Sequence, residues 1–322
     1  MPIMITSSST KITSLQAITA ALLACGLSAA PAQAGPNRTF VSGTGTDSGT
    51  CARTVPCRTF AFALTQTAAG GEIDVLDPAG YGTVTINHAI SIVNDGVGVA
   101  GVTAKTGVNP VGVLISAGAG DSVHLRGLTI DGPGTTVGSN GIAFGSGGNL
   151  AIENCVVRNF QTGIFIAPIT TSSFSVSNTI ASNNGAGISV QPSGSAVVTG
   201  VLRKIIADNN NAGIVAEGKF ATGALNVVIA DSETSNNNSG QGVFADSVSG
   251  AAPTSILVRN VVSRFNAVGL LADANSTLRV AHSVVTGNIT GVNTSGGTIF
   301  SYGDNDVNGN TTDNTGVLTT IP

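Results

Sequence analysis

The sequence predicts an all-β fold in which short parallel strands stack, coil upon coil, into a solenoid. The first observation is a repeated glycine, each time followed by an aliphatic residue, at positions Gly141, Gly163, Gly187, Gly213, Gly242, Gly269 and Gly291. Successive glycines are 22, 24, 26, 29, 27 and 22 residues apart. A period in the twenties is typical of solenoids, whose units are too small to fold alone and pack against their neighbours.

Composition is the second observation. Only 9 % of the 322 residues are charged, 43 are glycine, none is tryptophan and 4 % are aromatic. An ordinary globular domain carries about 25 % charged residues. Abundant Ser, Thr, Asn and Gly between Val and Ile residues suit short strands joined by tight turns. The net charge of −4 and the scattered basic residues exclude a clustered phosphate-binding surface, so we expect no nucleic-acid partner.

The third observation is that residues of one type fall into columns when the repeats are aligned on their glycines. The first apolar column contains Ile152, Val176, Leu202, Ile229, Val258 and Val280. The second contains Val156, Ile180, Ile206, Val262 and Val284. Side chains on stacked parallel strands lie above one another at intervals of about 4.8 Å, so we expect both columns to point into the core.

Glu233 is an exception, because it falls in the second apolar column. An unpaired buried carboxylate costs on the order of several kcal/mol, so Glu233 must pair with a cation, keep a proton, or be turned outward by a strand bulge. The 29-residue repeat that contains Glu233 favours the bulge.

Two further columns consist of asparagine. The first contains Asn159, Asn183, Asn209 and Asn236, and the second contains Asn184, Asn210, Asn237, Asn266 and Asn288. Asparagine tolerates left-handed turn geometry, and stacked amides can hydrogen-bond along the axis of a solenoid. We therefore interpret both columns as structural ladders at the turns.

Taken in order along the chain, the first element, residues 1–34, is interpreted as an export signal. Lys11 precedes an apolar stretch, which ends in the small-residue cleavage site Pro31–Ala34. The mature chain would begin at Gly35, with no later run of about 18 apolar residues to span a membrane. A secreted, periplasmic or cell-envelope location follows. The alternatives are a single transmembrane anchor, which the polar residues Thr13, Ser14, Gln16 and Thr19 within the stretch disfavour, and a lipoprotein attached through Cys25.

The cysteines fit an oxidising compartment. Cys51 and Cys57 are close enough to close a small loop, and we expect a disulfide between them. A metal pair is the alternative, but the neighbourhood lacks further His or Cys ligands. We interpret Cys155 as a small apolar core residue, because no histidine lies near it in the aligned repeats.

Three segments carry a family resemblance. They are residues 38–83, with the motifs Arg38–Gly43, Pro56–Phe60 and Gly70–Val75, then Leu125–Gly132, and finally Ser301–Asn305. These segments resemble the secreted right-handed parallel β-helix proteins of the pectate-lyase-like superfamily. The resemblance implies a right-handed parallel β-helix, with an amino-terminal cap and first coils in residues 35–110 and the β-helix repeats in residues 111–322.

In that family a short amphipathic helix covers the open end of the solenoid. Phe60, Phe62 and Leu64 suit this helix here, with Thr59 as its start and Gly70 as its stop. The resemblance carries over no catalytic residues. The hydrolase motifs Asn-Thr-Asp, Asp-Asp, Gly-His-Gly and Arg-Ile-Lys, and the epimerase motif Asp-Pro-His-Asp, are all absent.

The densest charge lies in the middle of the repeats. The aligned coils place Arg203, Lys204 and Asp208 on one coil and Asp231 and Glu233 on the next. Carboxylates near cations could hold a sugar, or a carboxylate pair could perform acid-base catalysis. The alternative is a set of surface ion pairs, each worth at most about 1 kcal/mol.

One motif matches the first half of a calcium loop. Asp304, Asp306 and Asn308 stand at the spacing of the first three ligands, but the twelfth position is Thr315 where a bidentate Glu is expected. These three residues are our candidate Ca²⁺ ligands, and the alternative is an Asn-rich terminal turn. No other cofactor is expected.

Two functional hypotheses follow. In the first, the protein is an exported, non-catalytic β-helix that presents a polar face to a polysaccharide or a cell-surface glycan. In the second, it is a polysaccharide lyase, glycoside hydrolase or epimerase that uses the charged residues from Arg203 to Glu233. A purely structural role is a third reading, because a fold alone does not specify a function.

Overall fold

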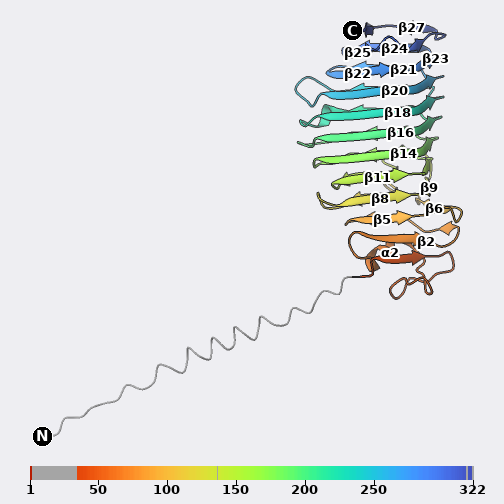
Figure 1. Cartoon of the computed structure of the whole chain (residues 1–322), viewed down its shortest axis with the longest axis vertical. Coiled ribbons are helices and arrows are strands. Elements are labelled where there is room, and N and C mark those ends of the chain that lie inside the picture. Colours follow the sequence, from red (N-terminus) through yellow and green to blue (C-terminus); the bar gives the residue numbers. More distant parts are fainter. Residues whose placement is uncertain (2–34, 136, 317, 321–322) are drawn as a thin grey trace. The chain divides into compact units, whose positions relative to one another are not determined.

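The computed structural model describes Met1 and residues 35–135, 137–316 and 318–320. The expected export signal lies outside the described residues apart from Met1, and so does Cys25. Pro36–Pro322 forms one compact unit. In this unit short strands stack in parallel from the amino-terminal cap to the last coils (Figure 1), which confirms the predicted all-β solenoid.

The described strands form an 18-stranded sheet and a 10-stranded sheet. The 18-stranded sheet consists of two parallel ladders that share its four longest strands, β14 (Ser172–Ser182), β16 (Val198–Asp208), β18 (Leu225–Ser235) and β20 (Thr254–Arg264). The first ladder also contains β1 (Arg38–Val41), β2 (Gly71–Val75), β5 (Ile90–Val93), β8 (Ser122–Arg126), β11 (Asn149–Glu153), β22 (Ser276–Ala281), β25 (Thr298–Ser301) and β28 (Leu318–Thr320). The second also contains β3 (Ala79–Gly80), β6 (Ala100–Thr103), β9 (Leu128–Asp131), β12 (Val156–Arg158), β23 (Val284–Thr286) and β26 (Asp306–Val307).

The 10-stranded sheet contains the repeated glycines. Its strands are β4 (Val84–Ile86), β7 (Val111–Ser116), β10 (Asn140–Ser146), β13 (Thr162–Ile166), β15 (Ala186–Val190), β17 (Ala212–Glu217), β19 (Gln241–Asp246), β21 (Val268–Asp273), β24 (Thr290–Ser295) and β27 (Thr312–Asn314). A Cβ atom on Gly187 would lie 2.7 Å from the carbonyl oxygen of Gly213 in the next coil. The same clash recurs along the sheet, so the repeat exists because the backbones of adjacent coils leave no room for a side chain.

A left-handed residue bends each long strand where the two ladders meet. Asn178, Lys204, Asp231 and Asn260 have φ angles of 46°, 53°, 51° and 52°. Such a residue shifts the in-and-out alternation of the strand by one position. Leu202 before the bend and Ile205 after it are therefore buried, whereas Ile206 is 42 % exposed.

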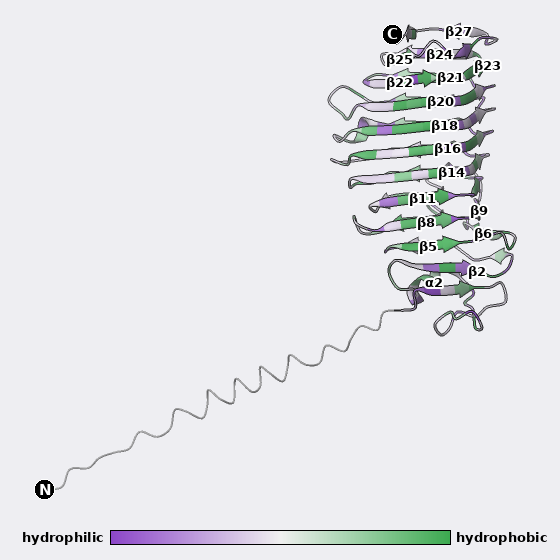
Figure 2. Cartoon of the chain, in the orientation of Figure 1, coloured by the Kyte–Doolittle hydropathy of each residue, from purple (hydrophilic) through white to green (hydrophobic). Residues whose placement is uncertain are grey.

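The two apolar columns consequently face opposite ways. Every member of the first column is buried, as predicted, and hydrophobic stretches follow most of the stacked strands in Figure 2. The prediction for the second column is wrong, because Ile180, Ile206 and Val262 are exposed on the outer face. The alignment itself is correct, since Ile180 pairs with Ile206 and Ile206 with Glu233. A column of identical residue types does not reveal which way it points.

Glu233 is therefore not a core residue. It lies in the outward column, and its carboxylate forms an ion pair with Arg264 at 2.7 Å. The expected bulge is also absent, because the register from Ser232 to Ser235 against β20 is continuous. The extra residues of this long coil lie in the turn at 236–240 and the loop at 218–224.

The asparagine ladders are confirmed. Asn159, Asn183, Asn209 and Asn236 have φ angles of 65°, 57°, 54° and 56°. In the second column, the backbone N–H of each asparagine donates to the side-chain amide oxygen of the asparagine in the next coil, at 2.9 to 3.1 Å. This ladder consists of Asn184, Asn210, Asn237, Asn266, Asn288 and Asn310. Asp313 ends this buried ladder by accepting the N–H of Asn310.

The capping helix is also confirmed. Helix α2 (Phe60–Gln66) begins after Thr59, whose hydroxyl accepts the N–H of Phe62 at 3.2 Å, and lies at the amino-terminal end of the stack (Figure 1). Phe60 and Leu64 are buried against the first coils. The helix ends at Gln66, earlier than the stop expected at Gly70.

Cys51 and Cys57 form the expected disulfide. Cys155 is buried and has no disulfide partner among the described residues, and burial raises the pKa of its thiol to about 11. Such a thiol is almost fully protonated at neutral pH and suits a core position. None of the described helices is long and apolar enough to cross a membrane.

Candidate functional site

The charged residues that the sequence singled out lie on the outer face of β16 and β18, in the 18-stranded sheet. Arg203 Nε lies 2.9 Å from Asp231 Oδ2, and the amide of Asn260 donates to Asp231 Oδ1 at 2.8 Å. The hydrogen bond from Asn260, followed by that from Arg203, lowers the pKa of Asp231. This carboxylate is therefore a stable anion with two partners, on an exposed surface.

The other residues of this charged face are engaged separately. Asp208 Oδ1 accepts hydrogen bonds from Ser235 at 2.9 Å and from Asn236 at 2.7 Å. Glu233 pairs with Arg264, and Lys204 is exposed at the left-handed bend. The structure thus places Arg203, Lys204, Asp208, Asp231 and Glu233 on neighbouring coils, and we call this exposed surface the charged ridge. The contacts of Arg203, Asp208, Asp231 and Glu233 are separate from one coil pair to the next and do not converge on one point.

The candidate calcium ligands lie near the carboxyl-terminal end of the stack. Asp304 Oδ2 lies 2.9 Å from His282 Nδ1, and Asp304 Oδ1 accepts the N–H of His282 at 3.0 Å. Asp306 begins β26 and is exposed, as is Asn308. In the described part of the chain no group of three or more His, Cys, Asp or Glu side chains is arranged to hold a metal ion.

A groove that the sequence analysis did not identify lies on the outer face of the 10-stranded sheet. Its volume is about 490 Å³. We call it the ten-strand groove and define it by its lining residues Thr135, Gln161, Thr162, Gly185, Ala186, Ser189, Gln191, Asn211, Val215, Glu217, Gln241 and Phe244. Ser189, Val215 and Phe244 pair in register on adjacent strands and form one outward column. The remaining lining is mostly amide and hydroxyl.

One wall of the ten-strand groove contains charged side chains that are nearly buried. Glu217 and Asp246 are each 8 % exposed and pair in register at the ends of β17 and β19. Lys219 Nζ lies 2.5 Å from Glu217 Oε1 and 2.7 Å from Asp246 Oδ2, and Gln191 donates its amide to Glu217. Burial by itself lowers the pKa of Lys219, but its hydrogen bonds to Asp246 and Glu217 outweigh burial and raise it.

Ser189 is the unsatisfied group of this groove. It is 3 % exposed, and its hydroxyl has no hydrogen-bond partner among the residues that the structure describes. A buried polar group without a partner costs about 1–3 kcal/mol, which a ligand hydroxyl could recover. The ten-strand groove therefore combines a polar group that needs a partner with amides that can both donate and accept.

The charged wall of the ten-strand groove corresponds to a pattern that is visible in the sequence. The residue four places after the repeated glycine is Gln191, Glu217, Asp246 or Asp273 in four successive coils. This polar column directly follows buried strand residues, which is unusual for a position next to the core. A search for the coils with the most charged residues does not find this polar column, because each coil contributes only one residue to it.

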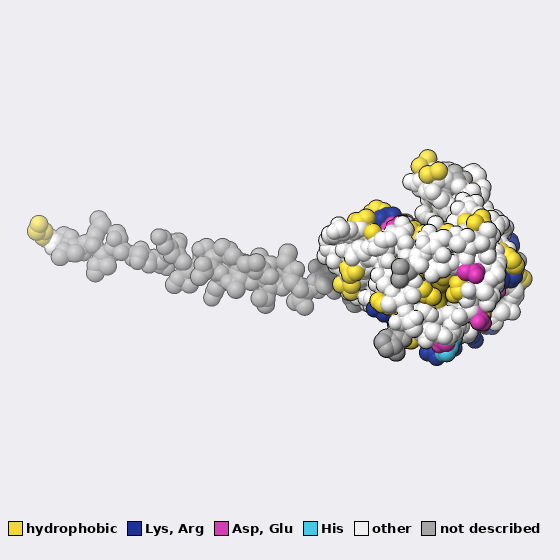
Figure 3. All heavy atoms as spheres, turned by 90° about the horizontal axis from the view of Figure 1, so that it is seen from above, with side chains coloured by type: hydrophobic (Ala, Val, Ile, Leu, Met, Phe, Trp, Pro, Cys, Tyr) yellow, Lys and Arg dark blue, Asp and Glu magenta, His cyan; other side chains and the backbone are white. Residues whose placement is uncertain are grey.

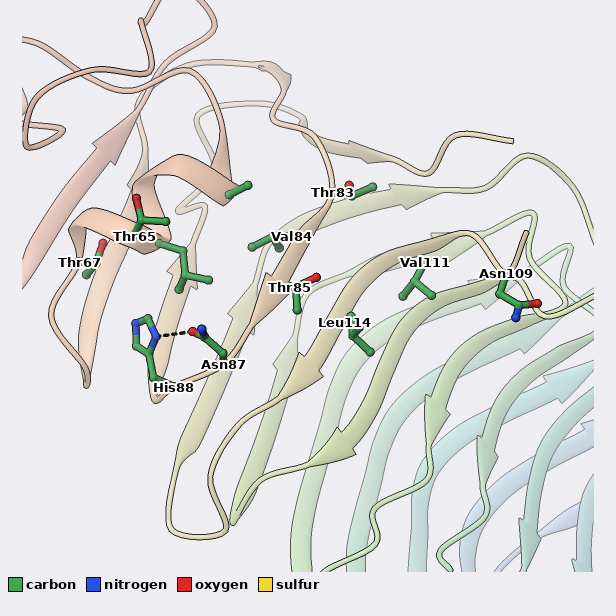
Figure 4. Close-up of a pocket in the computed structure, with 12 residues that line it drawn as sticks. Thr65, Thr67, Thr83, Val84, Thr85, Asn87, His88, Asn109, Val111 and Leu114 are labelled. Atoms are coloured by element: carbon green, nitrogen blue, oxygen red, sulfur yellow. Dashed lines mark hydrogen bonds between the residues drawn. The ribbon is translucent and has the colours of Figure 1, made fainter. Parts of the chain in front are cut away.

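A second cavity lies on the same sheet at the end covered by α2. It measures about 760 Å³, and hydroxyl-bearing residues such as Thr65, Thr83 and Thr85 line it together with Leu114 (Figure 4). His88 Nδ1 lies 2.7 Å from the amide oxygen of Asn87. The outer face of the 10-stranded sheet therefore contains two cavities, of about 490 and 760 Å³.

The comparison with protein families agrees with this architecture. Residues 111–312 match the protein family described as "Right handed beta helix region". Among solved structures, the chain is similar to the one titled "Crystal structure of pectate lyase Pel9A", with 15 % identity and a TM-score of 0.48. That similarity covers 84 % of this chain and 70 % of that chain. No curated protein matches the sequence.

Proposed function

The chain belongs to the family of right-handed β-helix proteins, and on this premise we propose that it is a non-catalytic scaffold that binds an uncharged glycan in the ten-strand groove. The observation that carries the proposal is the hydroxyl of Ser189, which is buried in the groove without a partner. A sugar hydroxyl can donate to it and accept from it, and so recover the cost of its burial.

The chemistry of the groove favours a neutral sugar over an acidic one. Gln161, Asn211 and Gln241 offer amide donors and acceptors, and Phe244 offers an aromatic face for the apolar side of a sugar ring. Lys219, the cation beside the groove, already contacts two carboxylates. An acidic sugar would meet Glu217 without a free cation to compensate its charge.

The repeated geometry of the sheet favours a polymer. Equivalent positions recur on β15, β17 and β19 at the spacing of neighbouring strands, about 4.8 Å. An extended chain lying along the axis would meet the same kinds of side chain at regular intervals. The groove is open, so it could accommodate an internal segment of a long polysaccharide.

An exported location is part of the proposal. It rests on the signal-like pattern in residues 1–34 and on the Cys51–Cys57 disulfide, which persists in oxidising compartments. A polysaccharide or a cell-surface glycan is accessible to a protein in such a place. The rival activity, cleavage or epimerisation of a polysaccharide, would use Arg203, Asp231 and Glu233 on the opposite sheet.

The test is retention of the purified protein on an array of neutral and acidic polysaccharides. We expect retention by at least one neutral polymer, weakened about tenfold by Gln241→Ala. Asn226→Ala, which removes an exposed amide from the other sheet, is the matched control and should leave retention unchanged.

Failure to retain any glycan would overturn the proposal. A parallel incubation with pectin, alginate and neutral polymers separates it from the rival. New reducing ends or unsaturated products would establish an enzyme, whereas unchanged polymers with retained binding would support the scaffold.

A further inference from the structure

Arg259 is the arginine without a partner. It is exposed on β20, and among the described residues no hydrogen bond, ion pair or aromatic ring engages it. In the described part of the chain every other arginine has such a partner; these are Arg38, Arg53, Arg58, Arg126, Arg158, Arg203, Arg264 and Arg279. Each of these arginines has an ionic, hydrogen-bonding or aromatic partner, and Arg259 differs from them among the described residues in having none.

Arg259 also lines a hollow of about 300 Å³, together with Leu257, Ala281, His282, Tyr302 and Asp304. The hollow forms where side chains are short, because Arg259 pairs in register with Ala230 on one side and Ala281 on the other. Seen from the carboxyl-terminal end of the stack, basic, acidic and histidine side chains lie side by side at one edge of an otherwise mostly uncharged surface (Figure 3).

The histidine of this hollow is held in an unfavourable backbone conformation. His282 has a φ of 49°, in the column where Asn154, Asn178 and Asn260 occupy the same left-handed bend. Left-handed geometry is easier for asparagine than for histidine, so the column loses backbone stability by having His282 here. Asp304 fixes the ring through Nδ1, which leaves Nε2 as the free ring nitrogen.

From these features we infer that the hollow at Arg259 binds the anionic group of a small hydroxylated ligand. The planar guanidinium presents two parallel N–H donors that match a carboxylate or a sulfate ester. His282 and Tyr302 supply a ring nitrogen and a hydroxyl for the hydroxyl groups of the same ligand. The backbone and ring N–H groups of His282 already compensate the charge of Asp304.

This site is independent of the ten-strand groove. It lies on the other sheet, requires a negative charge on the ligand, and would remain if the groove bound nothing. The two anion chemistries that fit Arg259, a carboxylate and a sulfate ester, are distinguished by the probes below.

The experiment is a titration of the full chain, followed by NMR or calorimetry, with glucuronate, glucose 6-sulfate and uncharged glucose. We expect one or both anions to bind at least tenfold more tightly than glucose, and the tighter of the two identifies the anion. Arg259→Gln should reduce that affinity at least tenfold. Arg126→Gln is the matched control, since Arg126 lies in the same outer column but pairs with Asp95.

His282→Asn tests the imidazole without disturbing the fold, because asparagine is the common residue of that column. We expect this variant to be at least as stable as the wild type and to bind the anion more weakly. Unchanged anion affinity in Arg259→Gln, or equal affinity for glucose and for both anions, would overturn the inference.

Discussion

Strand β16 carries Arg203 on the outer face of the 18-stranded sheet, and the next strand, β17, carries Glu217 on the outer face of the 10-stranded sheet. Arg203 is exposed and forms an ion pair with Asp231. Glu217 is withdrawn from water, with Gln191 and Lys219 as partners. The ridge is rich in charge but internally compensated, whereas the groove holds few charges and a polar group that lacks a partner. A ligand gains free energy by bonding to a buried polar group that lacks a partner. It gains little from surface charges that are already paired, however many there are.

The largest expected difference between the two faces concerns stability. Lys219→Met removes the cation between two nearly buried carboxylates and should lower the free energy of unfolding by about 2 kcal/mol, because uncompensated buried charge is costly. Thermal unfolding followed by circular dichroism measures the change. A melting temperature equal to that of the wild type would show that the groove charges are no more important than those of the ridge.

The next effect concerns binding. Phe244→Ala removes the aromatic face of the ten-strand groove and should weaken glycan binding about tenfold, which corresponds to about 1.4 kcal/mol. Equilibrium titration with the polymer found on the array gives the affinity. Phe265→Ala, which removes an exposed phenylalanine near the ridge, is the control. Equal losses in both variants would remove the distinction between the faces.

A smaller effect is expected from the ridge itself. Arg203→Gln breaks an exposed ion pair and should cost less than about 1 kcal/mol of stability, because water solvates both partners. Its glycan affinity should equal that of the wild type in the same titration. A loss of glycan binding in this variant would transfer the site to the ridge and favour the enzyme hypothesis.

The faces should also respond to opposite extremes of pH. The folded pKa of Asp231 is lowered, so its contribution is present above the unfolded value of about 3.9 and is lost as the pH falls through the folded value. The folded pKa of Lys219 is raised, so its contribution is present below about 10.4 and is lost as the pH rises through the folded value.

Melting temperatures of Asp231→Asn and Lys219→Met across the pH range test this contrast. The small deficit of Asp231→Asn relative to the wild type should disappear in acid, and that of Lys219→Met should disappear in alkali. The reverse pattern would contradict the pairing described for the two faces.

The fold could be predicted from the sequence because it depends on residue types that repeat. The glycine period, the first apolar column and the asparagine ladders each reflect a contact made by every coil, so each one is visible in the alignment. Thr59 could likewise be recognised as the start of α2, because a helix cap is a local feature. Even the registers of the second column, from Ile180 to Glu233, were aligned correctly.

The direction of that second column could not be predicted. Lys204 and Asp231 adopt the left-handed geometry that Asn178 and Asn260 adopt in the neighbouring coils. A lysine does not indicate such a bend, and one aspartate, although enriched in this geometry, does not identify it alone. Without the bend, the alternation places Ile206 and Glu233 in the core. Because this backbone angle was not recognised, Glu233, a half-buried carboxylate paired with Arg264, was predicted to be an anomaly in the core.

The candidate site was less predictable than the fold. Whether Ser189 has a hydrogen-bond partner depends on atoms from several coils, and no residue pattern encodes that absence. Arg259 has no ionic partner on the adjacent strands because its neighbours in register are Ala230 and Ala281, and two alanines do not stand out in the sequence. The polar residue four places after the glycine was detectable, but its burial was not.

The central claim is that the ligand surface is the ten-strand groove and not the charged ridge. Ser189→Phe fills the groove with a residue that its column already accepts at Phe165 and Phe244, and Ile206→Phe adds the same bulk to the exposed face of the other sheet. The decisive measurement is the affinity of both variants for the neutral glycan. We predict that Ser189→Phe abolishes binding and that Ile206→Phe retains it; wild-type affinity in Ser189→Phe would contradict the account.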